Sequence, residues 1–166
     1  MLLTLWIGTL TGNVQSIVDS GFMPSSSGRL GPGIYLTDDF NVAKTVARHR
    51  GKGSNMIVLK VQVKVPRVVE LNVGSVPEER HDKNAQWAQK GDVAASGVHP
   101  AWLGLAPFKE WVVRDPLCCK VTDIFMLNGV LETGLQCRES ERITLHVANN
   151  VTINGDIKNC NMLPYC

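Results

Sequence analysis

The sequence has little charge and no long apolar run, and each shortage excludes a class of protein. Charged residues make up 19% of the 166 positions and hydrophobic residues 44%, so the chain can form a core and is not a disordered segment. Seventeen basic and fifteen acidic residues give a net charge of +2, too balanced to indicate a nucleic-acid or membrane-surface protein from charge alone. No apolar stretch reaches the roughly 18 residues that a membrane helix needs. The length suits one domain, or one domain with an appendage.

Metal-binding patterns are also missing. The five cysteines contain no Cys-x-x-Cys pair, and the four histidines show no mutual spacing for a metal ion or a nucleophilic pair. We therefore expect no metal site. Three cysteines lie in the last thirty residues, so a disulfide in the tail stays open: Cys137, Cys160 and Cys166.

The first half of the chain predicts short strands that alternate with short helices. Residues 2–9 are too apolar for a surface loop and predict a buried strand, and residues 13–19 predict a helix that ends at Gly21. A second strand is expected at residues 34–36. The side chains of Thr37, Asp38 and Asp39 can then cap a helix.

That second helix has an apolar face and a basic end. Its buried stripe is formed by Val42, Ala43, Val46 and Ala47. The basic triplet at residues 48–50 lies where the helix dipole is negative, and we favour this dipole role over a phosphate site.

The clearest strand pattern is at residues 56–71, where apolar and polar residues alternate until Pro66 interrupts them. Residues 72–100 dissolve into Gly, Pro and charge and predict a long functional or mobile loop. The tryptophans of this region, Trp87 and Trp102, are expected to be core anchors. Further strands are expected at residues 110–114 and 119–126.

The tail has its own pattern. Apolar residues alternate at positions 143–147, and Asn154-Gly155 is a type I′ hairpin signal. We therefore expect a β-rich ribbon at residues 129–166, packed on a main domain at residues 1–128.

Three strand segments each carry an unusual residue near one end. They are Leu5-Trp6-Ile7-Gly8-Thr9, then Gly31-Pro32-Gly33-Ile34-Tyr35-Leu36, then Glu110-Trp111-Val112-Val113-Arg114-Asp115. Each alone has a structural explanation: a bulge, a core aromatic residue or an edge strand. In this order they resemble the motifs of the poly-ADP-ribose polymerase-like (diphtheria-toxin-type) ADP-ribosyltransferase catalytic domain. The resemblance spans roughly residues 2–127 and leaves the tail unexplained.

The resemblance implies an α/β (α+β) ADP-ribosyltransferase fold. Its core would be a split, mostly antiparallel sheet with two short helices and a C-terminal β-ribbon. NAD would be the substrate: Gly8, with Thr9, would hold the nicotinamide amide through the backbone, and Tyr35 would stack on the ring. Glu110 would stabilise the positive charge that develops on the ribose. Gly33 belongs to the glycine-rich turn of the second motif.

The sequence departs from this pattern at three positions. Ile7 stands where the family has a histidine that hydrogen-bonds the adenosine ribose, which removes roughly 1 kcal/mol or more of binding. Ala43 stands at a serine that holds the carboxamide, and Val46 at a second stacking aromatic residue. Arg29 is a candidate replacement for the missing histidine, with a solvated loop arginine as the alternative.

These residues predict a mono-ADP-ribosyltransferase or an NAD glycohydrolase that acts as a monomer. The acceptor, protein or nucleic acid, is left open, and no membrane partner is expected. The alternative is a catalytically inactive relative that binds ADP-ribose, nucleic acid or a protein partner, which the changes at Ile7, Ala43 and Val46 favour. An RNA 2′-phosphotransferase is the weaker third reading, because it needs several arginines and a histidine around the phosphate.

Overall fold

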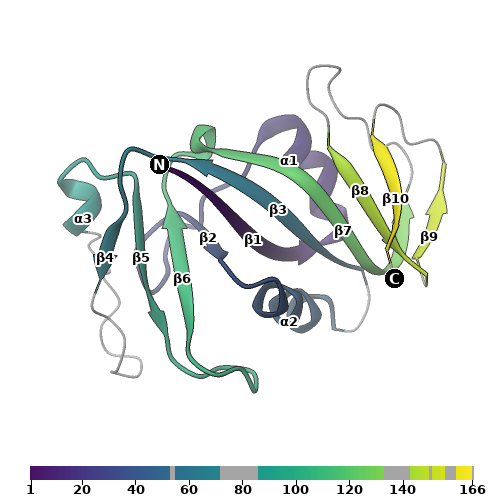
Figure 1. The fold of residues 1–166 in the computed structure, drawn as a ribbon, viewed down its shortest axis with the longest axis horizontal. Helices are drawn as coiled ribbons and strands as arrows, with labels where there is room; N and C mark the ends of the chain where they lie inside the picture. Colours follow the sequence, from purple (N-terminus) through teal and green to yellow (C-terminus); the bar gives the residue numbers. More distant parts are fainter. Residues whose placement is uncertain (53–54, 72–85, 133–142, 150, 156–159, 166) are drawn as a thin grey trace.

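A ten-stranded, mostly antiparallel sheet and three α-helices make up the part of the chain that the computed structural model describes. This part comprises residues 1–52, 55–71, 86–132, 143–149, 151–155 and 160–165. The strand order is β10-β8-β7-β3-β1-β2-β6-β5-β4, with β9 paired to β7 beside this path (Figure 1). The architecture is therefore mixed α/β, of the α+β kind that the sequence predicts.

The elements follow each other in an irregular alternation. The helices are α1 (Val14–Ser20), α2 (Phe40–Gly51) and α3 (Gln86–Gln89). The strands are β1 (Leu2–Leu10), β2 (Ile34–Thr37), β3 (Met56–Lys64), β4 (Val69–Leu71), β5 (Ala94–His99), β6 (Phe108–Val113), β7 (Cys119–Glu132), β8 (Thr144–Ala148), β9 (Val151–Asn154) and β10 (Asn161–Tyr165).

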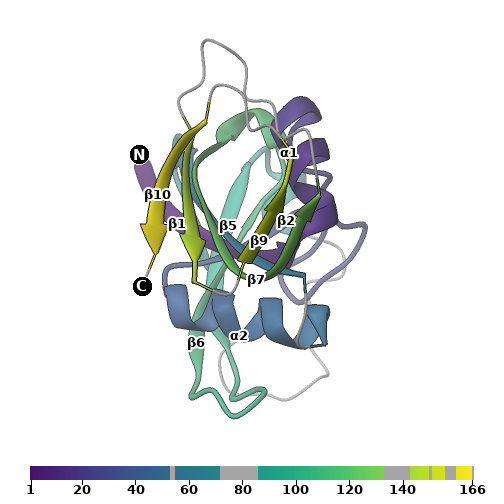
Figure 2. The ribbon, with the colours of Figure 1, turned by 90° about the vertical axis from the view of Figure 1, so that its right-hand side faces the viewer.

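The continuous apolar run at residues 56–59, at the start of β3, produces two buried faces on the larger half of the sheet, and the alternation follows it. Leu59 and Val61 lie in the main core with Val18 of α1, whereas Val58 packs with Ala47 of α2. Because neighbouring strand residues point to opposite faces, α1 and α2 cover opposite sides of this half-sheet (Figures 1 and 2). The break expected at Pro66 is confirmed, since β3 ends at Lys64 and β4 starts at Val69.

The two helices expected in the first half are also confirmed. Gly21 ends α1 with a φ of 82° and donates its N–H to the Ile17 carbonyl. Asp39 caps α2, and its carboxylate accepts from the N–H groups of Asn41 and Val42.

The sheet is nearly divided between β1 and β2. These two strands pair through the single register pair Trp6–Thr37 in the described chain, whereas β1 pairs with β3 along its whole length. On the other side β2 pairs with β6 over four residues. Had the β1–β2 ladder continued, Gly8 would lie opposite Tyr35. Instead the strands separate there.

Several expectations for the second half are wrong. Residues 86–99 are not loop but form α3 and β5, a strand built from small side chains that give a weak β signal; residues 72–85 lie outside the described residues. Trp87 is a core residue (3% exposed) as expected, and its indole N–H donates to the Leu30 carbonyl. Trp102, expected in the core, is 38% exposed.

The tail strands extend the main sheet in parallel. β8 and β9 both pair with β7, and β10 pairs with β8 (Figure 2). The second arm of a hairpin at Asn154-Gly155 would be residues 156–159, which lie outside the described residues, so the hairpin stays a prediction. The division after residue 128 stays a prediction, although β7 runs across it to Glu132.

The described cysteines differ in state. Cys118 and Cys119 are free thiols, and Cys160 is disulfide-bonded, while Cys137 and Cys166 lie outside the described residues. Among the described residues no three His, Cys, Asp or Glu side chains gather as metal ligands. A search of the same residues for a helix that could span a membrane finds none.

Candidate functional site

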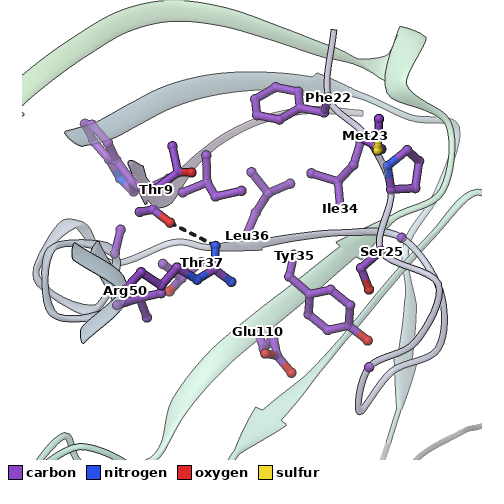
Figure 3. A pocket seen from close by; sticks show the side chains of 18 of the residues that line it. Thr9, Phe22, Met23, Ser25, Ile34, Tyr35, Leu36, Thr37, Arg50 and Glu110 are labelled. Atoms are coloured by element: carbon purple, nitrogen blue, oxygen red, sulfur yellow. Dashed lines mark hydrogen bonds between the residues drawn. The ribbon is translucent and has the colours of Figure 1, made fainter. Parts of the chain in front are cut away.

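A pocket of 820 Å³ opens where β1 and β2 separate. Its walls come from β1, α1, the segment before β2, β2 itself, α2 and the β5–β6 hairpin (Figure 3). Every site residue predicted from the sequence lines it: Ile7, Gly8, Thr9, Arg29, Gly33, Tyr35, Ala43, Val46 and Glu110. Residues more than one hundred positions apart therefore share one cavity.

Tyr35 is held in a fixed orientation on β2. Its hydroxyl donates to the Gly31 carbonyl (2.6 Å) and accepts from the Leu30 N–H (2.9 Å). Burial raises the pKa of this phenol above its ordinary value, although the Leu30 N–H opposes the rise, so the ring stays neutral. A Cβ on Gly28 would lie 2.1 Å from the hydroxyl oxygen, so a glycine is needed there for the ring to keep its place.

Glu110 lies on β6 beside Tyr35, and both side chains are drawn together in Figure 3. Desolvation raises the pKa of the Glu110 carboxyl from 4.5 to about 7, against the opposing charge of Arg29. Its Oε2 is buried and has no hydrogen-bond partner in the described part of the chain. A desolvated carboxylate with an unused acceptor at a cavity is poised to accept a hydrogen bond from a ligand or to stabilise a cation.

Arg29 lies on the same side of the pocket. Its charge acts on Glu110, on Tyr35 and on His99, and its buried Nε has no hydrogen-bond partner among the described residues. Arg29 is thus half-buried at the pocket, and its role in binding stays a prediction. A half-buried guanidinium that faces a cavity can bind a phosphate or carboxylate group.

Gly8 allows α2 to pack against the backbone of β1. A Cβ at this position would lie 2.0 Å from the Ala43 carbonyl oxygen and 2.7 Å from the Ala47 nitrogen. The Gly8 carbonyl accepts a hydrogen bond from Arg50 Nη1 (3.2 Å), the dashed line of Figure 3. The backbone group that the resemblance assigns to the nicotinamide amide is thus already paired with a side chain of this protein.

The remaining predicted positions offer less polar chemistry. The Thr9 hydroxyl accepts from Asn13 Nδ2 (2.9 Å), so it is engaged within the protein. Ile7, Ala43 and Val46 present apolar side chains to the cavity. Gly33 exchanges backbone hydrogen bonds with Ser25 and leaves no room for a Cβ against Val112.

Sequence reasoning missed other lining residues, among them four with charged or aromatic side chains: Arg50, His99, Trp102 and Phe108. A signal existed for Arg50, because positions 43, 46 and 50 share one helical face, and Ala43 was already expected at the site. The basic residues 48–50, taken together, instead favour a role in complementing the dipole of the helix. His99 and Phe108 are a cross-strand pair whose contact depends on β5, which the sequence did not predict.

Comparison with known proteins adds no homologue. No protein-family model matches the sequence, and no curated protein matches it at a significant level. The function must therefore be inferred from the pocket itself. This pocket combines a neutral phenol ring, a desolvated carboxyl and the half-buried Arg29 guanidinium, which suits a ligand with a planar ring, a developing positive charge and a phosphate group.

Proposed function

We propose that the protein binds NAD in this pocket and cleaves its nicotinamide–ribose bond, as a mono-ADP-ribosyltransferase or an NAD glycohydrolase on an ADP-ribosyltransferase fold. The observation that carries this proposal is the convergence of Glu110 and Tyr35 on one cavity. The divided sheet, with Gly8 and Tyr35 on its two sides, is consistent with it.

The proposed chemistry follows from charge. When the bond between ribose C1′ and the nicotinamide nitrogen breaks, its electron pair leaves with nicotinamide and positive charge develops on the ribose. The Glu110 carboxylate stabilises that charge and accepts a hydrogen bond from a ribose hydroxyl, and Tyr35 stacks on the leaving ring. The acceptor, or water, then forms the new bond to C1′ and loses a proton.

The second candidate is a module that binds ADP-ribose or a macromolecular partner without catalysis. The hydrogen bond from Arg50 to the Gly8 carbonyl favours it, because a bound nicotinamide amide would have to displace the guanidinium. The apolar side chains of Ile7, Ala43 and Val46 favour it as well.

The Glu110→Gln variant tests the proposal, since glutamine keeps the shape and removes the charge. Nicotinamide release should fall by about 100-fold or more, while calorimetry should give an NAD affinity close to that of the wild type. Glu70→Gln is the matched control: Glu70 is 80% exposed, pairs with Lys109, and does not line the pocket. Unchanged nicotinamide release in Glu110→Gln would refute the catalytic role of this residue. If calorimetry detects no binding of millimolar NAD to the wild type, the NAD proposal is refuted and the binding module remains.

A further inference from the structure

Beside the proposed NAD site, the pocket has an aromatic wall that nicotinamide binding does not use. Within it His99 and Phe108 stack at a centroid distance of 4.8 Å, with their planes 4° apart. Trp102 lies 5.7 Å from His99 and remains 38% exposed. All three residues line the pocket. We refer to His99, Phe108 and Trp102 as the aromatic platform.

The aromatic platform lies close to the Glu110 carboxylate. Phe108 and Glu110 lie two residues apart on β6 and point to the same face, a separation of about 7 Å along the strand. His99 is the cross-strand partner of Phe108, and Gly97 is the partner of Glu110. Gly97 has no side chain, so no side chain of β5 lies beside Glu110 at this position.

Trp102 is held in place by a tight turn. It exchanges two backbone hydrogen bonds with Leu105, and the central residues Leu103 and Gly104 have φ values of 50° and 77°. Leu103 therefore adopts a conformation that a leucine rarely takes. The turn fixes the backbone that carries the indole ring, and Trp102 lines the pocket while remaining exposed.

The platform contacts the basic last turn of α2 through His49. The Trp102 ring packs edge-on against His49 of α2, at 5.5 Å, so the hairpin contacts the last turn of that helix (Figures 1 and 2). Arg48, His49 and Arg50 are all exposed in this turn. Glu110 is the one acidic residue among the described residues that line the pocket, against two arginines.

We propose that the aromatic platform binds a base of a single-stranded nucleic acid, with the arginines of α2 contacting its phosphates. Base stacking on exposed aromatic residues beside positive charge is the usual basis of single-strand recognition. Burial lowers the pKa of His99 and Arg29 adds to this, although the contact with the Pro100 carbonyl opposes it, so the neutral imidazole is favoured.

Naming this base as the ADP-ribose acceptor rests on the proposed function, whereas the binding of the strand does not. In the transfer, the bond from C1′ to nicotinamide breaks and the leaving group keeps the electron pair. A nitrogen or oxygen of the stacked base forms the new bond to C1′ and releases its proton to solvent. No oxidant or further reactant is needed.

The binding test uses the whole chain, no NAD, and fluorescently labelled single-stranded RNA and DNA of about twelve nucleotides. Trp102→Ala should weaken the affinity about 10-fold or more, and Trp102→Phe should restore most of it. Met23→Ala is the control, because Met23 is an exposed apolar residue at the opposite end of the pocket from Arg50 (Figure 3). Circular dichroism confirms that each variant is folded.

The outcomes separate the two proposals. Equal affinities of the wild type and Trp102→Ala for the labelled strands would refute the nucleic-acid site. Two results together support both proposals. The Glu110→Gln variant should bind the strand as the wild type does, and mass spectrometry should find an ADP-ribose adduct on the strand only after incubation with the wild type and NAD. Binding that needs Trp102, with no adduct and no nicotinamide release, keeps the site and refutes the transferase.

Discussion

Thr37 and Glu110 are cross-strand partners on β2 and β6, and Thr37 is also the residue through which β2 pairs with Trp6 of β1. The carboxyl group therefore lies directly beside the point at which the sheet divides. Because the strands separate beyond this pair, a cavity forms next to Glu110. The position of the pocket is thus a consequence of strand register.

The raised pKa of Glu110 predicts a pH-dependent activity. Below about pH 7 the carboxyl is largely protonated in the free protein and cannot stabilise a positive ribose. The kcat/KM for nicotinamide release should therefore rise tenfold per pH unit on the acid side and level off above about pH 7. Measuring the rate of nicotinamide release at a series of pH values across this range gives the profile. An acid limb centred near the ordinary value of 4.5 would contradict the desolvated state of the carboxyl.

The same burial predicts that Glu110 costs stability at high pH. Between pH 4.5 and about 7 the folded protein binds a proton that the unfolded chain releases, so the free energy of unfolding falls as pH rises. Glu110→Gln removes this dependence, and its stability relative to wild type should grow by about 3 kcal/mol from pH 4.5 to about pH 8. Urea unfolding at both pH values measures the difference. Glu70→Gln should show no such growth, and a constant offset in Glu110→Gln would contradict the prediction.

The contact between Gly8 and α2 predicts a severe effect of one methyl group. Gly8→Ala would place a Cβ against the backbone of Ala43 and Ala47, which cannot rotate away, so α2 must shift from β1. The loss of stability should exceed about 3 kcal/mol, the upper end of ordinary overpacking. Gly12→Ala is the control, because nothing lies within 4 Å of its added Cβ, and it should change stability by less than about 1 kcal/mol. Thermal or urea unfolding compares them, and similar values for both would show that β1 and α2 are not in close contact.

The sequence predicted the central strands and helices because their signals are local. The alternation around Leu59 and the capping oxygens of Asp39 each lie within one element, and both predictions are confirmed. The candidate site residues were chosen by resemblance to a family pattern, and they do line one pocket.

What the sequence could not show depends on contacts between distant segments. The strand β5 consists of small residues, and its β structure depends on pairing with β6 rather than on its own propensity. Trp102 is exposed because a tight turn directs it to α2, and β8 and β9 both pair with β7 in parallel. Long-range pairing of this kind leaves no periodic trace in the sequence.

Arg50 provides the last prediction, because its guanidinium holds the Gly8 carbonyl that the nicotinamide amide would use. NAD must break this hydrogen bond, which involves a charged donor, before the amide can donate to the same oxygen. Arg50→Ala should therefore tighten NAD binding, and because Arg50 is exposed the gain should be modest, about 3-fold to 10-fold. Calorimetry with NAD measures it.

Arg48→Ala is the matched control, since Arg48 is an exposed arginine of the same helical turn that does not line the pocket. It should leave the NAD affinity within about 2-fold of the wild type, because a screened surface charge acts weakly at this range. If Arg50→Ala instead weakens NAD binding while Arg48→Ala does not, Arg50 holds a phosphate of the bound substrate. In that case the hydrogen bond to Gly8 is the resting position of a binding group and not a competitor of the ligand.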